Sequence, residues 1–168
     1  MKPVMDTDRA SIAIRDMKKK DLGRVAELER LCFSMPWSEK ALASELKNKV
    51  ALYQVLEHDG KIAAYAGMWL VLDEAHVTNV AVDPEFRRQG LGLMLMLDMM
   101  RRARSRGATR MTLEVREKNY GAQSFYAALG FIKAGIRRGY YSDTGEDAFI
   151  LWNDSLDATL EKFTDYQV

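Results

Sequence analysis

The sequence is poor in the residues that build disulfides and metal sites. It has one cysteine, Cys32, and two histidines, His58 and His76, among 168 residues. A single cysteine excludes an intrachain disulfide and suits a reducing compartment. The scattered histidines give no metal-ligand spacing, so we expect no metal site. Cys32 falls at an apolar helical position with neither histidine near it in sequence, which argues against a cysteine nucleophile.

Strong net charge and long apolar runs are also missing. The formal net charge is +1, so no strong field favours nucleic acid or a membrane surface. The longest apolar run, residues 93–97, ends at Asp98 and is far too short to span a bilayer. Residues 1–9 lack the apolar core of a signal peptide. We therefore expect a cytoplasmic protein without direct membrane or nucleic-acid contacts.

The composition that is present fits a globular protein. Hydrophobic residues make up 48% and charged residues 29%, which favours a soluble folded chain over a disordered one. The length suits one domain with a sizeable core. We expect residues 1–168 to form a single domain, with a core over about 11–153. The polar tail, residues 154–168, has scattered apolar side chains, and the sequence does not decide whether it frays or docks.

Apolar periodicity predicts a mixed α/β (α+β) chain with the order β-α-α-β-β-β-α-β-α-β-β. The predicted strands span residues 11–15, 50–57, 62–71, 75–82, 110–116, 131–138 and 148–153; the predicted helices span 18–32, 38–48, 90–106 and 119–129. Tight turns join the second, third and fourth strands, one of them Asp59-Gly60, which predicts an antiparallel meander. The pattern predicts a mixed, mostly antiparallel sheet flanked by helices on both faces.

Local signals define several helix ends and one buried face. Asp16 is a possible cap of the first helix, Ser38 opens the second, and Asn119 is predicted to cap the last. The helix over 90–106 is rich in methionine. We expect these methionines to lie in the core rather than on a binding surface: Met94, Met96, Met99 and Met100.

Residues 83–92, Asp-Pro-Glu-Phe-Arg-Arg-Gln-Gly-Leu-Gly, form a strand-to-helix turn with two arginines and two glycines. Glycines let the backbone approach a ligand, and a helix N-terminus favours anions. Arginines add charge-assisted contacts, so the turn suits a pyrophosphate. The alternative is an ordinary loop with a solvated basic pair. The turn lacks the Gly-Lys-Ser/Thr of a P-loop and the three-glycine spacing of a dinucleotide site.

The motif Arg87-Arg88-Gln89-Gly90-Leu91-Gly92 resembles the Arg-x-x-Gly-x-Gly signature of the GNAT acetyltransferases, and so does the preceding Asn79-Val80-Ala81-Val82-Asp83-Pro84. The similarity extends to about residue 153. Four further patterns resemble the bacterial ribosomal-protein-alanine N-acetyltransferase (RimI) branch: Pro36-Trp37-Ser38, Leu113-Glu114-Val115-Arg116 with Asn119, Phe125-Tyr126 before Gly130-Phe131, and Tyr140-Tyr141 with Gly145-Glu146-Asp147-Ala148. Glu117-Lys118 and Phe125 depart from the pattern of that branch, which leaves substrate preference open.

The resemblance implies a GNAT fold and acetyl-CoA as co-substrate, without a metal. Its pyrophosphate would bind mainly to backbone N–H groups of the turn, and its pantetheine arm to the preceding strand. The alternative, that Val80 and Val82 are core valines, can hold at the same time. The implied coenzyme-binding residues are Val80, Ala81, Val82, Arg87, Arg88, Gln89, Gly90, Leu91, Gly92, Asn119 and Tyr126.

Two residues are candidates for proton transfer. Glu114, on the polar face of its strand, is the candidate general base; the alternative is a strand glutamate that is either solvated or paired with Arg116. Tyr126 is the candidate general acid for the thiolate, because a tyrosine of pKa ~10 keeps its proton at neutral pH; the alternative is a tyrosine packed in the core. Direct attack of the amine needs no covalent enzyme intermediate.

The acceptor side is assigned by resemblance to Met35, Trp37, Tyr140 and Tyr141. Trp37 could equally anchor the helix pair in the core. The implied acceptor is a protein N-terminus, most simply the N-terminal alanine of a small-subunit ribosomal protein. The alternatives are other N-termini, lysine side chains, small amines, or a non-catalytic acyl-CoA-binding module. We expect a monomer or a weak homodimer.

Overall fold

The computed structural model describes residues 10–165, which build one seven-stranded sheet in the order β1-β2-β3-β4-β5-β7-β6. The strands are β1 (Ile12–Asp16), β2 (Ala51–His58), β3 (Lys61–Val71), β4 (Glu74–Val82), β5 (Arg110–Arg116), β6 (Ile132–Arg137) and β7 (Ala148–Asn153). The helices are α1 (Leu22–Cys32), α2 (Glu39–Leu46), α3 (Leu91–Ser105), α4 (Tyr120–Ala128) and α5 (Leu156–Lys162), with short 3₁₀ turns at Lys19–Asp21 and Pro84–Phe86. The predicted mixed, mostly antiparallel sheet is confirmed.

Turn chemistry explains the first half of the sheet. β1, β2, β3 and β4 pair antiparallel in sequence. Asp59 and Gly60, which join β2 to β3, have φ values of 51° and 81°, and a two-residue hairpin with positive φ matches the twist of its strands. β4 and β5 are parallel, so the long crossover through α3 connects them.

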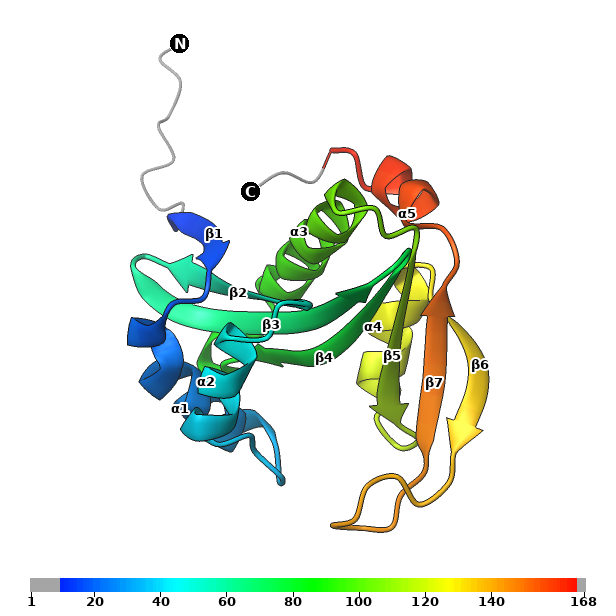
Figure 1. The fold of residues 1–168 in the computed structure, drawn as a ribbon, viewed down its shortest axis with the longest axis horizontal. Coiled ribbons are helices and arrows are strands. Elements are labelled where there is room, and N and C mark those ends of the chain that lie inside the picture. Colours follow the sequence, from blue (N-terminus) through cyan, green and yellow to red (C-terminus); the bar gives the residue numbers. More distant parts are fainter. Residues whose placement is uncertain (1–9, 166–168) are drawn as a thin grey trace.

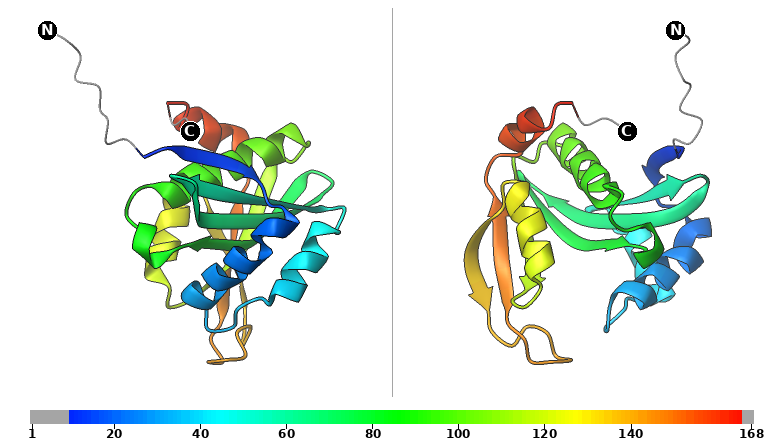
Figure 2. Two further views of the ribbon diagram at one scale, coloured as in Figure 1. Left: turned by 90° about the vertical axis from the view of Figure 1, so that its left-hand side faces the viewer. Right: turned by 180° about the vertical axis from the view of Figure 1, so that it is seen from behind.

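Helices cover both faces of the sheet. α3 and α4 lie on one face, where they share a core with β5 (Figure 2, right), and α1 and α2 lie on the other (Figure 1). The methionines of α3 belong to this core as predicted: Met96, Met99 and Met100 are fully buried and Met94 packs against them. Part of the tail docks: α5 packs beside α3 and buries Leu156 completely, and residues 166–168 lie outside the described residues.

One predicted cap is wrong. Asp16 ends β1 and accepts a hydrogen bond from Gln54 Nε2 at 2.6 Å. Asp21 instead organises the start of α1: its carboxylate accepts from the Lys18 N–H at 2.8 Å and from both terminal nitrogens of Arg15, at 2.7 and 2.9 Å. The predicted caps Ser38 and Asn119 are confirmed, with side-chain oxygens that accept from the N–H groups of Ala41 and Ala122 at 3.1 Å each.

The feature that positions the site is the divergence of β4 and β5 (Figure 1). Only Glu74–His76 of β4 pair with β5, opposite residues 110–112. Beyond His76 the register of β4 against β3 shifts at Thr78, which is a β-bulge. A bulge bends its strand, and β4 and β5 then run apart. Within residues 10–165, the rest of β4 therefore has a backbone edge without a strand partner.

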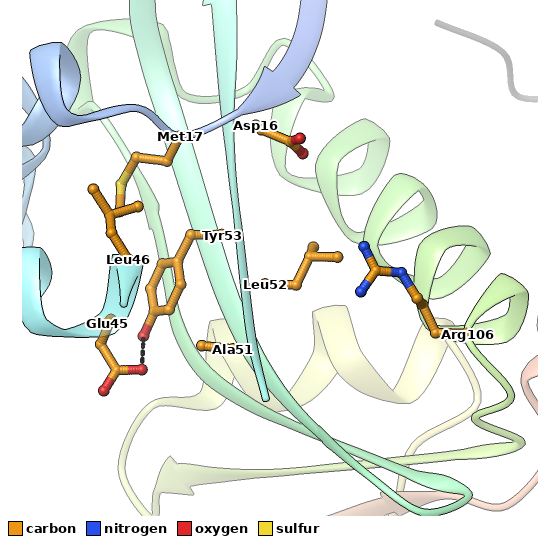
Figure 3. Close-up of a pocket in the computed structure, with 8 residues that line it drawn as sticks. All are labelled: Asp16, Met17, Glu45, Leu46, Ala51, Leu52, Tyr53 and Arg106. Carbon is orange, nitrogen blue, oxygen red and sulfur yellow. Dashed lines mark hydrogen bonds between the residues drawn. The ribbon is translucent and has the colours of Figure 1, made fainter. Parts of the chain in front are cut away.

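A pocket of about 190 Å³ lies elsewhere, beside the edge of β2 (Figure 3). Its lining residues are Asp16, Met17, Glu45, Leu46, Ala51, Leu52, Tyr53 and Arg106. None belongs to β4 or β5, so this pocket is separate from the divergence. Within residues 10–165 no helix is long and apolar enough to cross a membrane, and no group of three metal-ligating side chains comes together.

Candidate functional site

The free edge of β4 offers backbone groups to a ligand. The Asp83 N–H donates to the Ala63 carbonyl of β3 at 2.8 Å. Backbone groups alternate sides along a strand, so those of Val82 and Val80 point to the opposite, open edge. The Val82 carbonyl confirms this direction, because it accepts from Cys32 Sγ at 3.3 Å and from Arg87 Nε at 3.2 Å. An open edge of this kind can pair with an extended chain bearing amides. The side chains of Val80 and Val82 meanwhile pack against the core.

The start of α3 is a candidate anion site built from backbone. Among the hydrogen bonds of residues 10–165, none uses the N–H groups of residues 88–93 as donors. Arg88 and Gly90 have φ values of 63° and 76°, which turn the chain sharply into the helix. A Cβ on Gly92 would lie in ordinary van der Waals contact with Val82 Cγ2, at 3.6 Å, and with Phe125 Cζ, at 3.8 Å. Because glycine has no Cβ, this space stays open beside the backbone. Free N–H groups and the helix dipole together favour a phosphate.

The two arginines of the turn behave differently from each other. Arg87 folds back onto the end of β4 through Val82, and its guanidinium lies 3.6 Å from Cys32 Sγ. Arg88 is exposed. Burial raises the pKa of the Cys32 thiol, although Arg87 opposes this effect. Cys32 is therefore a poor nucleophile at neutral pH, as its apolar position in the sequence predicted.

Glu114 lies at the foot of the divergence. Its side chain is 10% exposed, and its Oε2 lies 2.8 Å from His76 Nε2 of β4. Arg137 Nε of β6 lies 3.4 Å from Oε1. Burial raises the pKa of the Glu114 carboxyl, but His76 and Arg137 lower it more, so the net shift is downward. Glu114 is therefore a carboxylate at neutral pH, which a general base must be.

The alternative interpretation, in which Glu114 is paired with Arg116, is wrong. Arg116 lies on the same face of β5 but turns to the β6–β7 loop, where its NH2 lies 2.9 Å from Asp143 Oδ2 and its NH1 3.4 Å from Glu146 Oε1. It also covers the ring of Tyr141 at 4.0 Å. The β6–β7 loop supplies carboxylates closer to Arg116 than its neighbour on the strand.

Tyr126 is buried on α4 between two aromatic rings. Its centroid is 5.1 Å from that of Phe125 and 5.5 Å from that of Phe131. Burial, and to a lesser extent Tyr141, raise the pKa of Tyr126, so its hydroxyl stays protonated across the physiological range. Within residues 10–165 no hydrogen bond engages this hydroxyl. Tyr126 is thus a packed tyrosine, as its alternative interpretation predicted, and its role as a proton donor stays a prediction.

Tyr141 connects the two candidate groups electrostatically. Burial raises its pKa to about 12; Arg116 opposes this rise, and Tyr140 and Glu114 add to it. Tyr141 also acts on Tyr126. Tyr140 packs edge-on against Tyr141 with centroids 5.1 Å apart, and is half exposed. The charge of Glu114 thus affects the pKa of Tyr141, and Tyr141 affects the pKa of Tyr126.

The elbow, residues 33–37 between α1 and α2, meets the β6–β7 loop at the open end of the divergence (Figure 1). Ser34 Oγ donates to Asp143 Oδ2 at 2.5 Å, and Ser142 Oγ donates to Met35 Sδ at 3.4 Å. Met35 is 41% exposed. These contacts join the elbow, which contains Met35, to the β6–β7 loop, which contains Tyr141, so two segments predicted to bind the acceptor lie side by side.

The backbone N–H of Trp37 is held by a buried carboxylate, Glu29, which the sequence interpretation missed. Glu29 is 1% exposed, and its Oε2 accepts from the Trp37 N–H at 3.1 Å. Its Oε1 accepts from Asn79 Nδ2 of β4 at 3.0 Å and from the Tyr65 hydroxyl. Glu29 lies about one helical turn from the buried Val25 and about two turns from the buried Leu22, and a charged residue at an apolar position is the signal that could have revealed it. Trp37 itself is half-buried against the α1–α2 core, as its alternative interpretation predicted.

Comparison with known proteins agrees with this geometry. Residues 22–131 match the acetyltransferase (GNAT) family. The chain is 41% identical over 140 residues to the [ribosomal protein bS18]-alanine N-acetyltransferase of Escherichia coli K12, covering 82% of this chain and 94% of that protein. The crystal structure of the Escherichia coli ribosomal-protein-S18-alanine N-acetyltransferase superposes with a TM-score of 0.79 at 40% identity, over 84% of this chain and 92% of the other.

A more distant structure extends the likeness of the fold. It is the PaiA N-acetyltransferase from Thermoplasma acidophilum in complex with coenzyme A, with a TM-score of 0.73 at 20% identity over 86% of this chain and 99% of the other. The family match covers more than half of the chain, including β4, the α3 turn, Glu114 and Tyr126. The chain therefore belongs to the acetyltransferase (GNAT) family.

Proposed function

We propose that this protein transfers the acetyl group of acetyl-CoA to the α-amino group of a protein N-terminus, with the N-terminal alanine of ribosomal protein bS18 as its substrate. The observation that carries the proposal is the position of Glu114. This carboxylate lies where β4 and β5 separate, between the open edge of β4 and the junction of the elbow with the β6–β7 loop. The name of the 41% identical relative supports the choice of acceptor. A ribosomal substrate would place the reaction in the cytoplasm.

The donor would bind along β4 and across the turn. The pyrophosphate of acetyl-CoA accepts hydrogen bonds from the free N–H groups of residues 88–93, with Arg88 able to add charge. The pantetheine amides pair with the backbone of Val80 and with the Val82 N–H on the open edge, because the Val82 carbonyl already accepts from Cys32 and Arg87. This places the thioester near the point where β4 and β5 part, with Tyr126 on the α4 side and Asn119 at the start of the same helix.

The acceptor amine must be neutral to attack. An α-amino group of pKa near ~8 is about a quarter neutral at pH 7.5, whereas a lysine of pKa ~10.4 is almost wholly charged. The amine nitrogen attacks the thioester carbonyl, and Glu114 takes the proton that the nitrogen must lose, directly or through one water. The tetrahedral intermediate then collapses, the C–S bond breaks, and the Tyr126 hydroxyl donates to the departing thiolate. The products are the acetylated N-terminus and free coenzyme A.

A peptide assay tests the proposal. Purified protein is incubated with acetyl-CoA and peptides that begin with the bS18 sequence, and thiol release and the mass of the product are measured. Matched peptides carry a blocked N-terminus with a free lysine, or a different first residue. We expect acetylation of the free N-terminus and none of the blocked peptide. Acetylation of lysine alone, or coenzyme binding without turnover on any amine, would contradict the proposal.

A further inference from the structure

His76 lies against the proposed base at the point where β4 and β5 separate. It is the last residue of β4 that pairs with β5, opposite Thr112. Glu114 stands two residues further along β5 on the same face, and its Oε2 lies 2.8 Å from His76 Nε2. His76, the last residue of β4 that pairs with β5, thus contacts Glu114 just beyond the point where the two strands diverge.

The imidazole is held from behind as well. Trp69 of β3 pairs with His76 across the strands and packs edge-on against it, with ring centroids 6.1 Å apart and planes at 86°. The Trp69 Nε1–H in turn donates to Glu45 Oε2 of α2 at 2.7 Å. Trp69 is thus fixed by its own hydrogen bond, and its packing holds the His76 ring in one orientation, with Nε2 toward Glu114.

The chemistry of the contact fixes its direction. A carboxylate only accepts hydrogen bonds, so Nε2 of His76 carries the proton and donates. The charged and titratable groups that face Glu114 are His76 from β4, Arg137 from β6 and Tyr141 from the β6–β7 loop. Among the side chains of residues 10–165, Oε2 has a short donor in His76, whereas Oε1 has Arg137 alone, at 3.4 Å, on a side chain that is 53% exposed. Oε1 is the oxygen left open to an incoming amine.

We propose that His76 is a positioning residue of the acetyltransferase site, which fixes the carboxylate of Glu114 by donating a hydrogen bond from Nε2 to Oε2 so that Oε1 faces the acceptor. The inference rests on the proposed role of Glu114 as general base. His76 does not touch either substrate. It acts through Glu114, and the same hydrogen bond favours the ionised carboxyl over the protonated one.

Two variants separate the hydrogen bond from mere packing. His76→Gln keeps an N–H donor at about the place of Nε2, and His76→Val removes the donor while suiting a strand. His58→Gln is the matched control, because His58 is the other histidine in the chain and lies at the end of β2 against Phe86, away from β5. Circular dichroism and coenzyme binding confirm that each variant is folded.

The first readout does not depend on turnover. With ¹³C-labelled glutamate, the carboxyl signal that disappears in Glu114→Gln is titrated by NMR. We expect its midpoint to rise by about one pH unit in His76→Val, by less in His76→Gln, and not at all in His58→Gln. The ¹⁵N spectrum of the two histidines should show a protonated Nε2 at His76 near neutral pH.

The second readout is kinetic. We expect His76→Val to lower kcat about tenfold at pH 8, because the base loses its orientation, and His76→Gln to recover most of that loss. KM for acetyl-CoA should stay unchanged. If the Glu114 titration and kcat are the same in His76→Val as in the wild type, the inference is overturned. If the wild type acetylates no N-terminus, the proposed function fails, while the titration still decides whether His76 holds Glu114.

Discussion

Ser34 Oγ donates a hydrogen bond to Asp143 Oδ2 at 2.5 Å and so joins two segments that are 109 residues apart in the sequence. Arg116 holds the same carboxylate from β5, at 2.9 Å. Hydrogen bonds from Arg116 and then Ser34 lower the pKa of Asp143 to about 2. The Asp143 carboxylate therefore stays charged at any ordinary assay pH. Its contact with Ser34 bridges the elbow and the β6–β7 loop and bounds one side of the proposed acceptor site.

Breaking this bridge should weaken acceptor binding. We expect Ser34→Ala to raise KM for the peptide about fivefold, since one hydrogen bond to a charged group is lost at a partly exposed site. KM for acetyl-CoA should not change, because the bridge lies on the acceptor side. The increase should be the same from pH 6 to pH 9. Steady-state kinetics with both substrates varied measures it.

Asp143→Asn should likewise raise KM for the peptide, because it removes the charge that Ser34 and Arg116 hold. Asp157→Asn is its matched control, because Asp157 of α5 forms an exposed pair with Arg104 of α3 at 2.8 Å. It should leave both KM values as they are. A peptide KM that Asp143→Asn does not raise, or an equal rise in Asp157→Asn, would show that the bridge has no part in holding the acceptor.

Removing the base should leave a folded, coenzyme-binding protein. We expect Glu114→Gln to lower kcat by about 10²–10⁴-fold at pH 7.5, the usual contribution of a positioned general base. The loss should shrink as pH rises above ~8, because a larger fraction of the acceptor amine is then already neutral. A pH series of kcat in both proteins checks this. A loss that is independent of pH would assign Glu114 to structure rather than to proton transfer.

Tyr126→Phe removes only a hydroxyl from a buried aromatic cluster. The ring contacts with Phe125 and Phe131 remain, so the coenzyme affinity and the melting temperature should hardly change. We expect kcat to fall about 10²-fold, because the thiolate loses its donor. An activated thioester with a better leaving group should lose less than acetyl-CoA does. Equal kcat in the variant and the wild type would remove Tyr126 from the mechanism.

The sequence predicted the parts of the site that depend on local chemistry. Gly90 turns the chain into α3, Asn119 caps α4, and Glu114 falls on the polar face of β5, each by a rule that acts over a few residues. It did not predict the partners of Glu114. His76 and Arg137 come from different strands, and only the splayed sheet brings them to one carboxylate.

The sequence failed to identify the ion-pair partners of Arg116 for the same reason. Arg116 is two residues from Glu114 and looked like its ion-pair partner, yet the β6–β7 loop places Asp143 and Glu146 closer. The β-bulge at Thr78 also left no sequence signal, because a bulge is defined by the register of the neighbouring strand. Long-range register and loop closure decide these contacts, and local patterns do not contain them.

The Arg15–Asp21 pair predicts how the fold responds to acid. The hydrogen bond from Arg15 lowers the pKa of Asp21 below its ordinary value of 3.8, against the opposing effect of burial. A carboxyl whose pKa is lowered in the folded state adds stability above its unfolded pKa and loses it as the pH falls. We therefore expect the free energy of unfolding to decline below about pH 4. In Asp21→Asn it should be about 2 kcal/mol lower at pH 7 and decline less with acid. Urea unfolding at several pH values measures both.

Gly67 on β3 tests the packing behind the β4 bulge. It pairs with Tyr53 on one side and Asn79 on the other. A Cβ at Gly67 would lie 2.0 Å from Tyr53 Cε1, an impossible contact. Gly67→Ala must therefore push the Tyr53 ring away, and with it the hydroxyl that lies 2.9 Å from Thr78 Oγ1 and 3.2 Å from Asn79 Oδ1.

We expect Gly67→Ala to cost about 3 kcal/mol of stability, the upper range for overpacking a core, and to lower the melting temperature by about 6–12 °C. Because Tyr53 contacts Thr78 and Asn79 at the bulge, the surviving folded protein should also bind coenzyme more weakly. Gly23→Ala in α1 is the control: a Cβ there meets nothing within 4 Å, and alanine favours a helix over glycine by up to about 1 kcal/mol. If both variants melt alike, the contact between Gly67 and Tyr53 does not shape the bulge.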